Sequence, residues 1–247
     1  MASATGTVEG LVAGIRAGRR DALARAITML ENGHPDGEAI RARLLDESPG
    51  KALRIGVTGP PGCGKSTLVD ALALRLVSRG RRVGIVAVDP SSPVTGGAFL
   101  GDRIRMGGAA ARPEVFIRSM ASRGVLGGLA AAATGAADLL AAFGFDTVIL
   151  ETVGVGQSEV AVAGVADTVL VVLAPGAGDG VQAMKAGLME IGHVFAINKA
   201  DLEGAEAARG SVEAGIRSRP GGPVPVLLTC ALSGAGVDEL LSELERC

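Results

Sequence analysis

The chain of 247 residues is 48% hydrophobic, holds 38 glycines and carries a formal net charge of −2 at pH 7, which fits one large α/β domain with many tight turns. With no Trp, no Tyr, five Phe and no stripe of Lys or Arg, it lacks the stacking platforms and basic surface typical of nucleic-acid-binding proteins. Its three cysteines and two histidines are scattered without a CxxC pair, so no zinc site is indicated.

Residues 1–48 are predicted to form an N-terminal helical extension, and residues 49–247 the main domain. Apolar residues recur at helical spacing in the extension, and a Gly-containing break at residues 33–37 divides them into a predicted pair of helices. Their apolar stripes either dock on the main domain or present a face to a partner. No apolar leader segment opens the sequence, so we expect a cytoplasmic protein.

From Lys51 onward, short apolar runs alternate with helical segments, which predicts an α/β fold with a doubly wound, mainly parallel sheet. The expected strands are residues 53–57, 83–88, 115–117, 147–150, 168–173, 194–197 and 224–228. The Ala-rich segment 127–145 contains Asp138 and several Gly, so we do not expect it to span a membrane. Ligands of such sheets bind beyond the carboxyl ends of the strands, where the motifs described below fall.

The first expected strand leads into a phosphate-binding pattern, Gly59-Pro60-Pro61-Gly62-Cys63-Gly64-Lys65-Ser66-Thr67. In such a pattern the glycines let backbone N–H groups converge on phosphate oxygens, Lys65 reaches the terminal phosphates, and the Ser66 hydroxyl ligates Mg²⁺. The amino end of the following helix adds its positive dipole. Because a strand precedes and a helix follows, we interpret the pattern as a triphosphate site and not as an accidental Gly-rich turn.

Two acidic residues, Asp89 and Asp102, follow the second expected strand in a segment that contains several Pro and Gly. Carboxylates so placed bind a Mg²⁺ on the phosphates, either directly or through water. Turn and N-cap roles are the alternative, which Asp89 before Pro90 suits well. We favour the metal role for both.

Glu151 and Gly154 follow the fourth expected strand and resemble the two parts of a γ-phosphate sensor. Glu151 supplies a carboxylate at the strand end, and Gly154 supplies a backbone N–H near the terminal phosphate, whose loss would release the segment. Val155 stands where Ras-like proteins carry the glutamine that orients water, so we expect slow unassisted hydrolysis.

A further glycine-rich segment, residues 175–185, ends at Lys185. It is either a plain turn from a strand into a helix, or a segment whose Lys185 brings positive charge to the γ-phosphate. In the second case Lys185 acts from its own chain or from a second copy, as arginine fingers do. The sequence leaves these alternatives open.

The sequence Asn198-Lys199-Ala200-Asp201 follows the sixth expected strand and predicts guanine selectivity. The Asp201 carboxylate accepts from both N1–H and the N2 amine of guanine, whereas adenine offers neither donor. Sites that hydrogen-bond a group reject analogues that lack it by as much as about 10⁴-fold. An ordinary solvated loop is the alternative for this tetrapeptide.

Five segments stand in one order, DPSSPVTGGAFLGDRIRM, FIRSMASRGVLGGL, ETVGVGQSE, PGAGDGVQAMKAGLMEIG and NKAD. Through them the chain, from residue 51 to about residue 240, resembles the MeaB/MMAA (ArgK-type) G-protein chaperones of methylmalonyl-CoA mutase. The resemblance implies a SIMIBI-class P-loop GTPase that binds GTP or GDP with Mg²⁺. It also implies a metallochaperone that gates the loading of adenosylcobalamin into a partner, an acyl-CoA mutase of the methylmalonyl-CoA mutase type, and protects this mutase. The cobalamin is then held by the mutase and not by this chain.

The resemblance also assigns roles to single residues. The phosphate and Mg²⁺ positions fall on Lys65, Ser66, Asp89, Asp102 and Glu151, and the base-binding positions on Asn198, Lys199 and Asp201 with Cys230, Ala231 and Leu232 in a second loop. Lys185 falls in a third switch segment thought to act across a dimer.

Several positions depart from the family pattern. His193 stands where Asp is common, Cys230 replaces the usual Ser, and residues 203–222 form a shorter segment than usual. Family members usually continue into a long helical arm that makes the homodimer, whereas this sequence ends at Cys247. The sequence therefore leaves undecided whether the chain forms a homodimer.

Two other functions share parts of this pattern. P-loop small-molecule kinases have the same phosphate loop, but the Asn198–Asp201 motif argues against them. A nickel-inserting GTPase needs clustered His and Cys ligands, which the sequence lacks.

Overall fold

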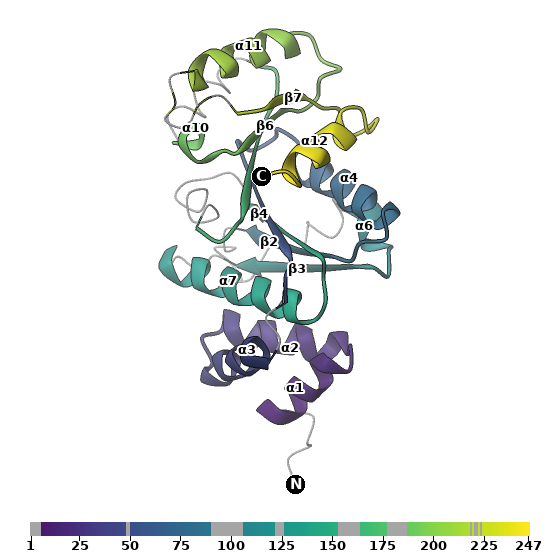
Figure 1. Cartoon of the computed structure of the whole chain (residues 1–247), viewed down its shortest axis with the longest axis vertical. Helices are drawn as coiled ribbons and strands as arrows, with labels where there is room; N and C mark the ends of the chain where they lie inside the picture. The colour runs from purple at the N-terminus through teal and green to yellow at the C-terminus, as the bar shows by residue number, and fades with distance from the viewer. Residues whose placement is uncertain are drawn as a thin grey trace, which may run out of the picture.

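A computed structural model describes residues 6–47, 50–89, 106–121, 126–152, 164–176, 187–217, 219, 222 and 224–247. Within these residues the chain forms a parallel sheet with helices on both faces, and a helical N-terminal part lies outside one of the helical layers (Figure 1). None of the described helices combines the length and apolar content that crossing a bilayer requires.

The described residues contain a 7-stranded sheet in the order β3-β2-β4-β1-β5-β6-β7, and every neighbouring pair is parallel. The strands are β1 (Leu53–Thr58), β2 (Val83–Asp89), β3 (Val115–Ala121), β4 (Thr147–Thr152), β5 (Thr168–Leu173), β6 (Val194–Ile197) and β7 (Val226–Leu228). This confirms the predicted doubly wound α/β fold, with a sheet that is parallel throughout.

Five strands differ in length from the expected runs: β1 and β2 are one residue longer and β4 two residues longer, while β3 and β7 change as follows. β3 continues past Ile117 to Ala121 and pairs with β2 over its whole length. Its second half was missed because Arg118 and Ser119 interrupt the apolar run. β7 begins at Val226, two residues later than expected, directly after Pro225, which has no N–H to donate to a neighbouring strand.

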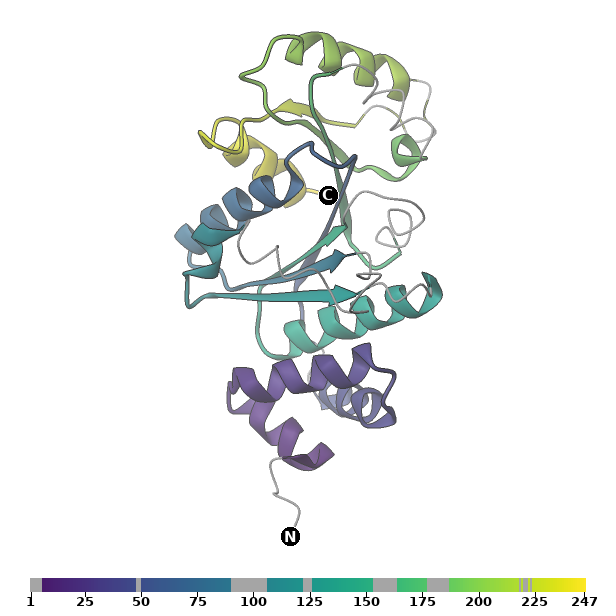
Figure 2. The ribbon, with the colours of Figure 1, turned by 180° about the vertical axis from the view of Figure 1, so that it is seen from behind.

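Helices cover both faces of the sheet because successive strand residues point to opposite sides. In β4, for example, Ile149 joins one core cluster and Val148 and Leu150 join another. The first face carries α4 (Lys65–Ser78), α6 (Gly107–Ala110) and α12 (Val237–Leu244), and the second carries α7 (Leu126–Ala142), α10 (Leu188–Ile191) and α11 (Ala205–Ile216) (Figure 2).

The N-terminal part contains three helices where the sequence predicted two, α1 (Val8–Arg16), α2 (Arg20–Glu31) and α3 (Pro35–Glu47). The additional break lies between α1 and α2, where Gly18 takes a φ of +74° that favours glycine. The apolar stripes of these helices pack together and against α7 on the second face.

Helix α7 lies between the sheet and the N-terminal helices (Figure 1). Its small residues allow close packing against the N-terminal helices: a Cβ on Gly135 would lie 2.8 Å from Leu30 Cδ1 of α2. This position explains a helix that is rich in Ala and Gly and has little polar surface.

One buried carboxylate connects the three layers. Asp138 of α7 is 5% exposed. It accepts from Arg41 Nε of α3 and from Arg54 Nη2 of β1, each at 2.6 Å. The hydrogen bond that Arg41 donates to Asp138 raises the pKa of the Arg41 guanidinium, against the opposing effect of burial. Asp138 therefore ties the N-terminal helices to the strand that leads into the phosphate loop.

Replacing Asp138 with alanine is expected to lower the free energy of unfolding by about 3 kcal/mol, because both arginines lose a buried partner. Urea denaturation followed by circular dichroism measures this change. Glu38→Ala is the matched control, since Glu38 is an exposed partner of Arg41 and its loss should cost less than about 1 kcal/mol. Equal losses of unfolding free energy in the two variants would show that the buried Asp138 contacts contribute no more to stability than an exposed ion pair.

Three residues that directly precede strands tie the amino ends of neighbouring strands together in one recurring way. In each tie, the residue's backbone N–H donates to a carbonyl near the start of the neighbouring strand, and its side chain accepts the N–H of that same neighbour. The pairs, with the two distances in that order, are Asp146 with Arg82 (2.9 and 2.7 Å), Asp167 with Arg54 (2.9 and 2.8 Å) and His193 with Val169 (2.8 and 2.9 Å). They join β4 to β2, β5 to β1 and β6 to β5.

Candidate functional site

The phosphate loop connects the carboxyl end of β1 to the amino end of α4. Two of its glycines are required by close contacts. Gly59 has a φ of +141°, and a Cβ there would lie 2.0 Å from the Val172 carbonyl oxygen of β5. Gly64 has a φ of +90°, and its Cβ would lie 2.5 Å from Asn198 Nδ2. The loop therefore packs directly on β5 and on the segment that follows β6.

The Lys65 side chain lies inside the loop and is buried. Its Nζ donates to the carbonyl oxygens of Gly59 and Pro60, both at 2.8 Å. These acceptors compensate the buried ammonium group, which has a third donor to offer to an anionic ligand.

Asn198 bridges the phosphate loop and the loop after β7. Its Nδ2 donates to the carbonyl oxygens of Cys63 and Gly64 at 3.0 and 3.4 Å. Its Oδ1 accepts from the Ala231 N–H at 3.1 Å and from Thr229 Oγ1 at 3.4 Å. Both ends of the amide thus have protein partners, and Asn198 fixes the position of the two loops relative to each other.

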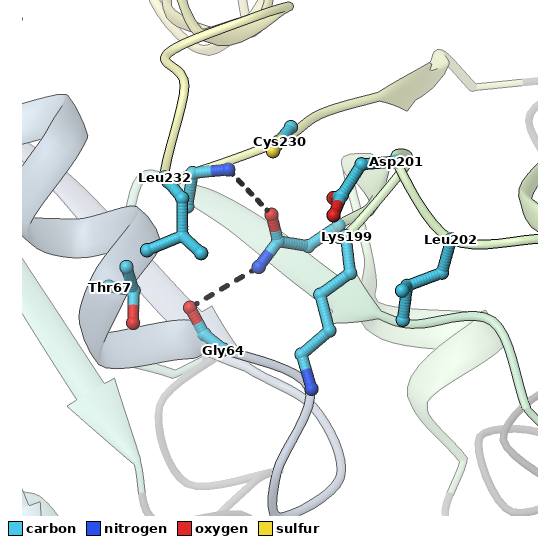
Figure 3. Close-up of a pocket in the computed structure, with 9 residues that line it drawn as sticks. Gly64, Thr67, Lys199, Asp201, Leu202, Cys230 and Leu232 are labelled. Atoms are coloured by element: carbon cyan, nitrogen blue, oxygen red, sulfur yellow. Dashed lines mark hydrogen bonds between the residues drawn. The ribbon is translucent and has the colours of Figure 1, made fainter.

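Lys199 makes a second connection to the phosphate loop. Its Nζ donates to the Gly62 carbonyl oxygen at 2.7 Å. Among the described residues it is the one non-glycine residue with positive φ, at 57°. This uncommon backbone conformation turns the chain so that the alkyl part of Lys199 lines a pocket (Figure 3).

A pocket opens between these loops, with a volume of about 270 Å³. Its lining combines phosphate-loop residues with the two predicted base-binding segments: Gly64, Thr67, Asn198, Lys199, Asp201, Leu202, Cys230, Ala231 and Leu232. Figure 3 shows the exposed Asp201 carboxylate beside Lys199, with Cys230 above and to the left of them in this view. The predicted base-binding residues are therefore brought together around one cavity next to the phosphate loop.

The pocket also contains the two large hydrophobic side chains that are exposed in the described part of the chain. Leu202 is 49% exposed and Leu232 is 88% exposed. They come from different loops and lie on either side of Lys199 in Figure 3. Exposed apolar groups that line one cavity are typical of a ligand site.

A hydroxyl and a carboxylate meet at the other side of the loop. Ser66 Oγ donates to Glu151 Oε1 at 2.6 Å, and Glu151 is buried at the end of β4. These oxygen donors fit a hard cation such as Mg²⁺. The described residues contain no group of three or more His, Cys, Asp or Glu placed to hold a metal. In nucleotide sites Mg²⁺ is usually bound through one or two carboxylates together with phosphate oxygens and several waters.

The other predicted residues are placed only in part. Asp89 is the last residue of β2, and only its backbone is described. Asp102, Gly154 and Lys185 lie outside the described residues.

Two residues of the site were not predicted from the sequence. Leu202 lines the pocket, and Thr229 donates a hydrogen bond to Asn198 Oδ1. An apolar residue directly after Asp201, in a loop, was an available signal for Leu202. Thr229 carries no signal, since its contact joins residues 31 positions apart.

Comparisons with known proteins agree on one family. The family model described as "Methylmalonyl Co-A mutase-associated GTPase MeaB" matches residues 23–247. A putative GTPase of Pyrococcus abyssi is 46% identical, with 97% of this chain and 75% of the relative covered. The GTPase ArgK of Escherichia coli is 43% identical, with 92% and 71% covered.

Solved structures show the same fold. The crystal structure of a LAO/AO transport system kinase is 32% identical, with a TM-score of 0.77 and with 100% of this chain and 76% of that chain covered. HypB of Helicobacter pylori, in complex with nickel, has a TM-score of 0.58 with 85% and 91% covered, but at 18% identity it supports the fold alone.

Proposed function

We propose a function that starts from the family to which the chain belongs, the MeaB family of methylmalonyl-CoA mutase-associated GTPases. In this proposal the chain gates the loading of adenosylcobalamin into a cobalamin-dependent acyl-CoA mutase and protects that mutase. The chain is a GTPase, and its relatives carry that name over most of its length. In this proposal the mutase holds the cobalamin, and this chain holds GTP or GDP with Mg²⁺.

The observation that carries the nucleotide part of the proposal is that Asn198 joins the phosphate loop to the pocket around Asp201. The phosphate loop and the pocket around Asp201 share this residue as a common support. A ligand that fills both has an anionic tail and a heterocyclic base, as GTP has. Adenine lacks the two donors that the Asp201 carboxylate accepts, so guanine is favoured.

The residues near the phosphates have separate roles in this proposal. Lys65 binds the terminal phosphates, while Ser66 and Glu151, with Asp89 and Asp102, hold Mg²⁺. When bound, the ion neutralises charge that develops on the phosphate oxygens. Gly154 senses the γ-phosphate, and Lys185 adds positive charge from the same chain or from a second copy. Hydrolysis is slow until the partner binds.

Replacing Leu232 with alanine is expected to weaken GDP binding about tenfold, because a base loses apolar contact on one face. Isothermal titration calorimetry with GDP and IDP measures this loss. Both nucleotides should weaken equally, since an alkyl contact does not distinguish the N2 amine that IDP lacks. A loss restricted to GDP would show that Leu232 acts in selectivity instead.

The proposed role is tested by mixing the purified chain with candidate cobalamin-dependent acyl-CoA mutases. We expect a complex whose stability differs between GDP and a non-hydrolysable GTP analogue, and faster GTP turnover in the complex. A pull-down from the native host with both nucleotides identifies the mutase. If no mutase binds and none changes GTP turnover, the gating role is wrong.

A small-molecule kinase is the second candidate, because the solved LAO/AO transport system kinase is 32% identical to this chain. The pocket around Asp201 argues for guanine, but kinases with the same loop exist. Incubation with ATP or GTP and candidate metabolites separates the two functions. A phosphorylated product with ATP preferred over GTP would favour the kinase.

A further inference from the structure

Two buried threonines meet where β1 and β4 end. Thr58 is the last residue of β1 and Thr152 is the last residue of β4, and both are fully buried. The Thr152 hydroxyl has two acceptors, Thr58 Oγ1 at 3.2 Å and the Val57 carbonyl oxygen at 3.4 Å. Because a buried hydroxyl without a partner costs free energy, this contact favours keeping the two strand ends together.

The contact extends the pairing of the two strands to their last residues. The parallel register of β1 on β4 places Val57 opposite Glu151, and Thr58 and Thr152 follow as the next residue of each strand. On its other side Thr152 lies opposite Val88 of β2. The end of β4 is thus paired with β2 and joined to β1 by the hydroxyl pair.

Each threonine is the neighbour in sequence of a residue of the candidate site. Thr58 directly precedes Gly59, where the phosphate loop begins. Thr152 directly follows Glu151, whose Oε1 accepts from Ser66 Oγ at 2.6 Å. The hydroxyl pair therefore joins the strand that leads into the phosphate loop to the strand that carries the predicted cation ligand.

The hydroxyl pair lies on the face of the sheet opposite the cation ligand. Side chains alternate along a strand, so Glu151 shares the face of Ile149, which packs in the cluster around α4. Thr152 shares the other face with Leu150. The threonines therefore act on the site only through the strands. Mg²⁺ demands near-ideal octahedral geometry, and side chains of a site must be held within about 0.5 Å, so a small shift of the β4 end weakens its binding.

We propose that Thr152 is a positioning residue which, with Thr58 as its acceptor, fixes the end of β4 on β1 and so keeps the Glu151 carboxylate at the Mg²⁺ site. Neither threonine touches the ion or the nucleotide in this role. The inference rests on the proposed nucleotide function and adds two residues for which the sequence predicted no role.

The test uses the whole chain and two readouts that do not depend on GTP turnover. The first is GDP affinity in EDTA, and the second is the Mg²⁺ concentration that half-maximally slows GDP dissociation. The variants are Thr152→Val, Thr58→Val, the double variant with both substitutions, and Thr152→Ser. Valine has nearly the shape of threonine without its hydroxyl. Thr147→Val is the matched control, because it removes a buried hydroxyl from the amino end of the same strand.

We expect Thr152→Val to raise the required Mg²⁺ concentration about fivefold, the effect of one net hydrogen bond. Thr58→Val should raise it about threefold, because the Thr152 hydroxyl keeps the Val57 carbonyl oxygen as an acceptor. The double variant should resemble Thr152→Val, since both substitutions remove one shared interaction.

The remaining variants separate positioning from stability. Thr152→Ser keeps the hydroxyl and should restore most of the Mg²⁺ response. GDP affinity in EDTA should stay within about twofold of wild type in every variant, since the nucleotide contacts are untouched. Thr147→Val should match wild type in both readouts, even where its melting temperature falls.

An unchanged Mg²⁺ requirement in folded Thr152→Val protein would overturn the inference and leave the proposed function intact, whether or not its melting temperature falls. Effects of the two valine substitutions that multiply in the double variant would show that the threonines act independently, which also contradicts the proposal. A wild-type protein that binds neither GDP nor GTP would instead refute the nucleotide function itself. If Thr152→Val does not fold, an unchanged Mg²⁺ requirement in Thr58→Val overturns the inference.

Discussion

Replacing Lys65 with alanine is expected to weaken binding of a non-hydrolysable GTP analogue by about 10²- to 10³-fold, as expected when one partner of a buried charged contact is removed. The ammonium group is lost to the phosphates, and the carbonyl oxygens of Gly59 and Pro60 lose their donor. GTP turnover should fall below detection. Calorimetry in Mg²⁺ buffer and a phosphate-release assay measure the two effects.

Lys51→Ala provides the control for Lys65→Ala, because Lys51 is exposed and lies just before β1. It removes the same charge from the same part of the chain without touching the phosphate loop, and its GTP affinity should match wild type. Wild-type affinity in the Lys65 variant would refute the assignment of the loop as a phosphate site. Circular dichroism of both variants shows whether the fold is retained.

Replacing Asp201 with alanine is expected to reduce the preference for GTP over ATP by about 10³-fold, because the carboxylate no longer accepts from the guanine N1–H and N2 amine. Contacts to the phosphates should remain, so ATP affinity should change little. Inosine triphosphate isolates the N2 amine: wild type should prefer GTP to ITP, and the variant should bind both equally. Competition against a fluorescent GDP analogue measures all three nucleotides.

Glu203→Ala is the matched control for Asp201→Ala, since Glu203 is an exposed acid two residues further along the same loop. Its GTP to ITP ratio should equal that of wild type. An Asp201 variant that keeps the wild-type ratio would show that guanine is selected elsewhere in the pocket.

Much of the fold could be predicted because its determinants are local. Apolar runs such as residues 168–173 and 194–197 coincide with β5 and β6, and the phosphate loop lies between β1 and α4 as its motif requires. The N-terminal helices were counted wrongly because Gly18 is a weak signal compared with the Gly and Pro of residues 33–37.

The contacts that support the site could not be predicted, because they join residues distant in sequence. Asn198 reaches Cys63 across 135 positions, and Asp138 reaches Arg54 and Arg41 across 84 and 97 positions. Residue type suggests that such groups have partners, but only the strand order identifies them. Asp70 of α4, which accepts the Ala109 N–H across 39 positions, gives no signal either, since an acid on a half-polar helix is ordinarily a solvated residue.

The paired hydrogen bonds of Asp146, Asp167 and His193 bear on how the sheet is assembled. Adjacent parallel strands have no tight turn between them to set their alignment. A slip by one residue would send every buried side chain to the wrong face. Each of the three residues precedes the later strand of its pair and binds a neighbour already synthesised. Each of these strands is therefore preceded by a residue whose paired hydrogen bonds set its alignment with a strand that was synthesised earlier. In His193 the acceptor is an imidazole nitrogen in place of a carboxylate oxygen.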